Sequence, residues 1–159
     1  MGVETLTVVI TPLERARLYF RYRPIHVAVA SDPDGLVHRA FGLPRFEVVD
    51  DEGAPAQWPL RVTREDFRAV RNDADGQLPA PLPLVAVQKE LNQQDGFELT
   101  EVDIEIRRTH WSQLAGHFLI DRTGVIRWAH AEAEHAISDF GRRPGDKDIL
   151  AAARALALG

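Results

Sequence analysis

The sequence contains no cysteine and only one methionine among its 159 residues. Without cysteine, the chain can form neither a disulfide nor the thiolate that thiol-redox enzymes use as a nucleophile. Basic residues are not in excess either. The sequence has 19 lysine and arginine residues and 24 aspartate and glutamate residues, which gives a formal net charge of −5. Because binding to polyphosphate needs a basic surface, this balance argues against a nucleic-acid partner.

No apolar run approaches the roughly 20 residues that a membrane-spanning helix needs. The N-terminus has no basic segment followed by an apolar one, so no signal peptide is predicted. We therefore expect no membrane partner and a cytoplasmic location. Hydrophobic residues make up 45% and charged residues 27% of the sequence, and one domain over residues 1–159 is expected at this length.

The beginning of the chain has the pattern of an α/β protein. Residues 5–10 form a β-branched run that is typical of a strand buried on both faces. Thr11, Pro12 and Glu14 have the spacing of a capping box, which predicts a helix over residues 13–22.

A second strand is predicted over residues 26–30, and a short helix over residues 36–41. Between them, Asp32-Pro33-Asp34-Gly35 has the start of a calcium loop but lacks the remaining oxygen ligands, so we interpret it as a turn. We expect structural roles for His26 and His38. Strands that alternate with helices in this way favour a parallel sheet with right-handed crossovers.

The middle of the chain, residues 44–115, is predicted to be a long insertion of helices and loops packed over the sheet. It holds most of the ten prolines of the sequence, which favour loops and short elements. Helices are predicted over residues 64–71 and 84–92. Residues 100–114 are ambiguous, because their first half alternates like a strand and their second half has a helical pattern.

The end of the chain is more regular. Residues 117–121 and 125–130 are predicted to form a β-hairpin, with Gly124 at the turn position that needs a positive φ. A polar connection follows. Asp146 is then expected to cap a final helix over residues 147–158.

Three stretches of the sequence share their order and spacing with a known family. They are Val8-Val9-Ile10-Thr11-Pro12, Ala30-Ser31-Asp32-Pro33-Asp34 with His38-Arg39-Ala40-Phe41-Gly42-Leu43 after it, and Phe118-Leu119-Ile120-Asp121-Arg122-Thr123-Gly124-Val125-Ile126-Arg127. The chain thereby resembles the peroxiredoxin-like (AhpC/TSA) branch of the thioredoxin fold. This resemblance implies an α/β fold with a thioredoxin-like sheet and flanking helices. The activity that the family label implies is that of an antioxidant oxidoreductase.

The chain departs from that family at the catalytic unit. The family carries its peroxidatic cysteine on an earlier strand and helix, and this sequence begins where the next strand is expected. The run Leu114-Ala115-Gly116-His117 stands where the family often has an activating arginine or a cis-proline. The resemblance therefore implies no catalytic residue here, an incomplete sheet, and a binding or interaction protein that cannot run cysteine peroxidase chemistry by itself.

The missing strand is central in thioredoxin-like sheets, so its absence affects the strands beside it. Strands 5–10 and 117–121 are each expected to have an unpaired, apolar edge, and such edges invite pairing. We expect either that these two strands pair directly, or that two copies of the chain complete one sheet as a homodimer.

The richest polar cluster in the sequence comprises His130, Glu132, Glu134 and His135. If the preceding strand continues, the first three share one face, and imidazole with carboxylates can bind Zn²⁺, Mn²⁺ or Fe²⁺. His110 and His117 lie near this cluster in the sequence and could contribute further ligands. The spacing matches no strong metal motif, and the alternative interpretation is a solvated strand end and loop, where such residues are common. No resident cofactor is expected; the alternative is a cysteine-independent enzyme that holds a divalent metal at residues 130–135.

Overall fold

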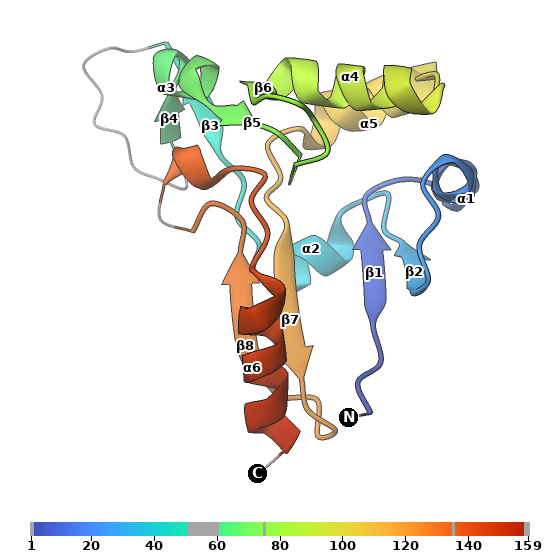
Figure 1. Ribbon diagram of the computed structural model, residues 1–159, viewed down its shortest axis with the longest axis vertical. Coiled ribbons are helices and arrows are strands. Elements are labelled where there is room, and N and C mark those ends of the chain that lie inside the picture. The colour runs from blue at the N-terminus through green and yellow to red at the C-terminus, as the bar shows by residue number, and fades with distance from the viewer. Residues whose placement is uncertain (1, 51–60, 75, 135, 158–159) are drawn as a thin grey trace.

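The computed structural model describes residues 2–50, 61–74, 76–134 and 136–157. This part of the chain is a mixed α/β structure with six α-helices and small two-stranded sheets (Figure 1). The strands are β1 (Leu6–Val9), β2 (Ala28–Ser31), β3 (Glu47–Val49), β4 (Arg61–Thr63), β5 (Arg71–Asn72), β6 (Leu82–Pro83), β7 (Gly116–Ile120) and β8 (Ile126–Ala131). The helices are α1 (Leu13–Tyr22), α2 (Leu36–Ala40), α3 (Arg64–Ala69), α4 (Leu84–Asp95), α5 (Glu101–His110) and α6 (Asp146–Ala157), with a 3-10 turn η1 (Ile137–Asp139). None of these helices has the length and apolar character needed to cross a membrane.

The opening β1–α1–β2 unit confirms the predicted parallel pairing, with Leu6 opposite Ala28 at the start of the register. The predicted capping box is wrong. Pro12 is itself the N-cap, in an extended conformation, and the helix has no side-chain cap. Thr11 therefore lies one residue too early to cap, and its carbonyl instead accepts a hydrogen bond from the Ser31 hydroxyl at 2.6 Å.

The ambiguous segment of the insertion is a helix, so the strand interpretation of its first half is wrong. Thr100 and Asp103 form a capping box that starts α5. Of the alternating residues, Val102 and Ile104 are 45% and 57% exposed, so they form no buried strand face. The cap, a local signal, determines the structure here and the alternation does not.

The predicted hairpin of β7 and β8 is confirmed, with His117 opposite His130 in its register. Gly124 has a φ of +84°, as the turn requires. The Asp121 carboxylate accepts hydrogen bonds from the Thr123 hydroxyl and from the Arg127 guanidinium, and these hold its pKa well below the ordinary value. The turn is therefore fixed by the side chain that precedes it.

The last helix begins at Asp146, which is therefore its first residue and not its cap. The predicted end at Leu158 lies outside the described residues. Two ion pairs tie α1 to the helices of the insertion: Arg15 binds Asp103 on α5, and Arg23 binds Asp95 at the end of α4.

The main hydrophobic cluster lies in the insertion and just before β7. It is formed by Phe46, Val62 and Leu114, and partly buried side chains pack around it from β3, α3 and η1. The Phe46 ring meets Trp111 edge to face at a centroid distance of 5.3 Å. The best-packed part of the described chain is thus outside strands β1, β2, β7 and β8.

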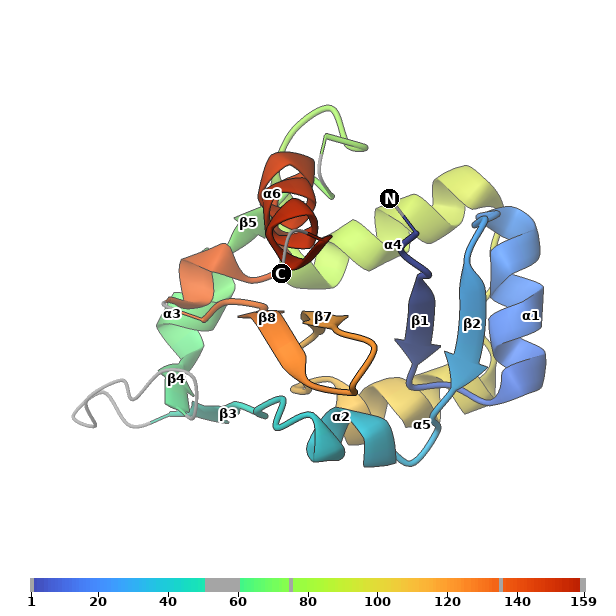
Figure 2. The same cartoon turned by 90° about the horizontal axis from the view of Figure 1, so that it is seen from below.

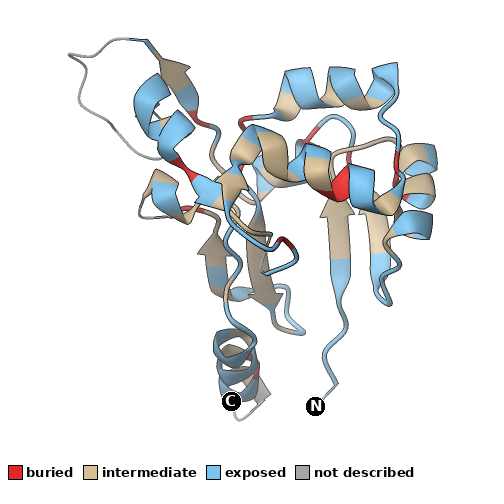
Figure 3. Ribbon diagram, turned by 45° about the horizontal axis from the view of Figure 1, so that its top comes forward, coloured by how far each residue is buried: buried red, intermediate tan, exposed pale blue. Residues whose placement is uncertain are grey.

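Those four strands are poorly buried. Figures 1 and 2 show them in the order β8, β7, β1, β2. The described chain has ten buried apolar residues, and none of them lies on β1, β2, β7 or β8 (Figure 3). The accessible surface is 10,898 Å², whereas a compact monomer of 17.8 kDa exposes about 8,000 Å². The sheet region therefore has much less cover than a closed α/β core.

Candidate functional site

Neighbouring strand edges without partners are the first candidate site. β1 pairs only with β2, and β7 pairs only with β8, among the strands of the described chain. The prediction that β1 and β7 pair directly is therefore wrong. Figure 1 shows these two strands side by side and running in opposite directions. One edge of each strand has no partner in the described chain, and such edges invite pairing with a further strand.

The segment that carries α2 contacts both strand pairs. At its beginning, the Asp32 N–H donates to the carbonyl of Val9 at the end of β1, at 2.8 Å. At its end, the Phe41 ring packs on Phe118 of β7 at a centroid distance of 4.7 Å. The α2 segment thus contacts the β1 side through Asp32 and the β7 side through Phe41.

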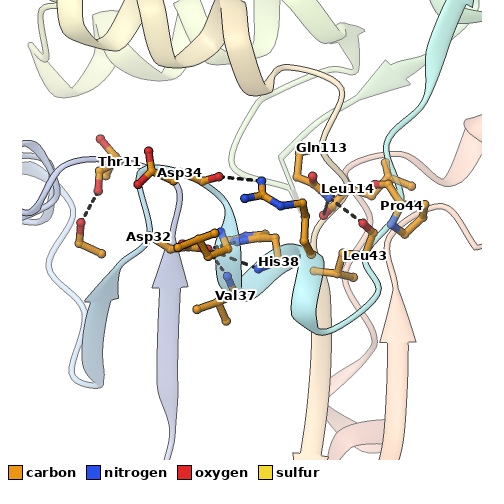
Figure 4. Close-up of polar contacts among 12 residues, drawn as sticks. Thr11, Asp32, Asp34, Val37, His38, Leu43, Pro44, Gln113 and Leu114 are labelled. Atoms are coloured by element: carbon orange, nitrogen blue, oxygen red, sulfur yellow. Dashed lines mark hydrogen bonds and ion pairs between the residues drawn. The ribbon is translucent and has the colours of Figure 1, made fainter.

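Asp32 organises the start of α2, as Figure 4 shows. Its carboxylate accepts the backbone N–H of Leu36 at 2.8 Å and of Val37 at 2.9 Å, and the Nδ1 of His38 lies 3.0 Å away. Asp32 is 5% exposed. Desolvation alone would raise the pKa of this carboxyl, but the hydrogen bonds from His38 and the helix amides outweigh it and lower the pKa.

A pocket of about 200 Å³ opens beside this pair, between α2 and the end of α5. Gln113 shapes its wall, because its side-chain amide donates to the carbonyls of Leu43 at 3.1 Å and Pro44 at 3.0 Å. His38 and His110 both line the pocket. Their two imidazoles come from segments more than sixty residues apart, so a sequence pattern could not have paired them.

The predicted metal-binding residues are only partly brought together. His130 faces His117 across the hairpin, with ring centroids 6.2 Å apart. The Glu132 carboxylate is engaged elsewhere: it accepts the N–H of Ala115 at 2.9 Å and of Gly141 at 2.6 Å. Glu134 is exposed, and His135 lies outside the described residues. Within the described ranges, no three His, Asp or Glu side chains are placed to hold a metal ion.

The His117–His130 pair nevertheless has the properties of a pair of ligands. Burial lowers the pKa of His117, and the proximity of His130 and Arg143 lowers it further, so the ring is neutral near pH 7. The buried Nε2 of His130 has no hydrogen-bond partner among the described residues. Neutral imidazole is the form that coordinates metals.

Sequence reasoning missed two features of these sites. Asp32 was interpreted as part of a turn, and its contacts with the first amides of α2 and with His38 were not expected. The two hydrogen bonds that the Glu132 carboxylate accepts could not be predicted, because their donors lie on two loops that meet only in the folded chain.

A scan against protein-family models found no match to this chain. Searches of curated proteins and of solved structures found none either.

Proposed function

We propose that this chain is a thioredoxin-like binding protein without peroxidase activity, which completes its sheet by pairing with a second copy of itself. The observation that carries the proposal is the pair of neighbouring, unpaired edges on β1 and β7. The three stretches that resemble the AhpC/TSA branch support the thioredoxin-like assignment. The absence of cysteine removes the nucleophile of that family. The cytoplasmic location stays a prediction.

The exposed area supports a partner of substantial size. The chain exposes 10,898 Å², which is about 2,900 Å² more than a compact monomer of this mass. A standard interface removes about 800 Å² from each partner, and obligate homodimers remove more. Exposed apolar residues lie on the same strands, with Leu6 on β1 61% exposed and Ile126 on β8 46% exposed. A second copy seated against these strands would cover both the apolar side chains and the open edges.

Replacing Leu6 with lysine tests this function. We expect the wild-type protein to sediment at twice the 17.8 kDa mass of one chain. The Leu6→Lys variant is expected to sediment as a monomer, because a charge on an edge strand opposes strand pairing. Sedimentation velocity measures the mass, and far-UV circular dichroism verifies that the variant keeps its secondary structure.

Leu36→Lys is the matched control. Leu36 is also 61% exposed, but it lies on α2 and not on a strand. It is expected to leave the dimer intact. A wild-type protein that is monomeric at about 100 μM, the range in which weak dimers form, would contradict the proposal, and so would equal dissociation of the two lysine variants.

A second candidate function is a cysteine-independent enzyme with a divalent metal in the 130–135 region. The observation in its favour is the unpartnered Nε2 of His130 opposite His117. If this function holds, Zn²⁺ at a hundredfold excess over its Kd should stabilise the fold by about 2.7 kcal/mol, and Tm should rise accordingly. The His130→Ala variant should lose that rise, while His26→Ala, at an exposed histidine outside the hairpin, should keep it. An unchanged wild-type Tm counts against the metal.

A further inference from the structure

The pocket between α2 and α5 has a basic side and an apolar side. Its basic side chains are His38, Arg107 and His110. Its apolar part includes Ile10 and Ile106. No carboxylate is among the described residues that line it. Arg107 therefore gives this pocket a positive charge, in a chain whose net charge is −5.

The donors of the basic side are available to a ligand. The Arg107 guanidinium has no ion-pair or hydrogen-bond partner among the described residues, whereas the adjacent Arg108 binds Glu105 at 2.7 Å. The His110 ring also has no hydrogen-bond partner in the described part of the chain. It is held by packing over Gly35, where an added Cβ would lie 3.8 Å from two of its ring atoms.

His38 is oriented by the buried acid behind it. Its Nδ1 lies 3.0 Å from the Asp32 carboxylate and donates to it, so Nε2 is the remaining nitrogen and donates to a ligand carboxylate only when the ring is the imidazolium. The charge of Asp32 is already compensated by helix amides, with the N–H of Leu36 at 2.8 Å and of Val37 at 2.9 Å. Asp32 therefore positions the imidazole without itself lining the pocket.

We infer that this pocket binds a small organic carboxylate whose apolar body lies against Ile10 and Ile106. The guanidinium of Arg107 would bind the carboxylate through charge-assisted hydrogen bonds, with the imidazoles of His38 and His110 beside it. The volume of about 200 Å³ is below the usual 300–1,000 Å³ of sites for drug-sized ligands, so the ligand is about the size of one ring. The pocket is formed within one chain and does not depend on the dimer.

Titration with benzoate tests this inference. Benzoate, followed by amide chemical shifts in NMR, is expected to bind saturably with a Kd of about 1 mM or tighter. The shifts should centre on residues 106–115. Benzamide, which has the same shape without the charge, should bind about tenfold more weakly. Inorganic phosphate, which has the charge without the apolar body, should also bind more weakly than benzoate.

Two arginine variants distinguish a site from general charge attraction. Arg107→Gln is expected to weaken benzoate binding about tenfold. Arg108→Gln removes the same charge one residue away, on a guanidinium already paired with Glu105, and should change Kd less than about twofold. The inference is overturned if benzoate does not saturate, if benzamide or phosphate binds as tightly as benzoate, or if the two arginine variants weaken binding equally.

Discussion

Replacing Leu114 with alanine is expected to lower the free energy of unfolding by about 3–5 kcal/mol. Leu114 is 1% exposed and packs with Phe46 and Val62 in the main hydrophobic cluster. The substitution removes buried methyl groups and leaves a cavity that the neighbouring aromatic rings can fill only in part. Because single domains are stable by only about 5–15 kcal/mol, this one change would remove a large share of the total.

Urea unfolding at one fixed protein concentration measures this effect, since any dimer makes stability depend on concentration. Val125→Ala is the control, because Val125 is 45% exposed beside the hairpin turn and its truncation should cost less than about 1 kcal/mol. A loss below about 1 kcal/mol for Leu114→Ala would show that the packed cluster does not hold the fold together.

Replacing Asp32 with alanine is expected to cost about 2–4 kcal/mol at pH 7, since it removes the cap of α2 and leaves buried donors without a partner. The amides of Leu36 and Val37 and the imidazole of His38 all lose their acceptor. Asp34→Ala is the matched control. Asp34 lies two residues away in the same turn and is exposed, so its truncation should change stability by less than about 0.5 kcal/mol.

The effect of Asp32 depends on pH with a definite sign. The pKa of its carboxyl is lowered in the folded protein, so the ionised form is favoured by folding. Its contribution is complete above the unfolded aspartate pKa of about 3.9 and is lost as the pH falls toward the lower folded value. The stability difference between wild type and Asp32→Ala should therefore shrink when urea unfolding is repeated at pH 3. A difference that is constant from pH 7 to pH 3 would contradict this role.

The elements with local signals could be predicted from the sequence. Gly124 fixes the hairpin turn, and Thr63 caps α3 by accepting the N–H of Asp66 at 3.1 Å. Both signals act within four residues, so they are visible in any window of the chain. The parallel pairing of β1 and β2 followed from the alternation of strand and helix.

Features that depend on distant segments could not be predicted in this way. Arg15 binds Asp103 across 88 positions of sequence, and nothing near either residue indicates the other. The side chain of Glu132 is one that can bind a metal, yet its carboxylate accepts hydrogen bonds from the backbone of two separate loops, at Ala115 and Gly141. Direct pairing of β1 and β7 was a reasonable expectation from strand chemistry, but among the described strands β1 pairs with β2 and β7 with β8.

The absence of buried side chains on β1, β2, β7 and β8 has a consequence for cooperativity. In most α/β domains the sheet is the last part to open, because it holds the core. Here the strands hold no buried apolar side chain, so their backbone amides are expected to open at a low free energy. The amides around the Leu114 cluster are expected to open only near the global free energy of unfolding. Any partner that seats against the strands then stabilises them by mass action, and order in the sheet becomes a function of protein concentration.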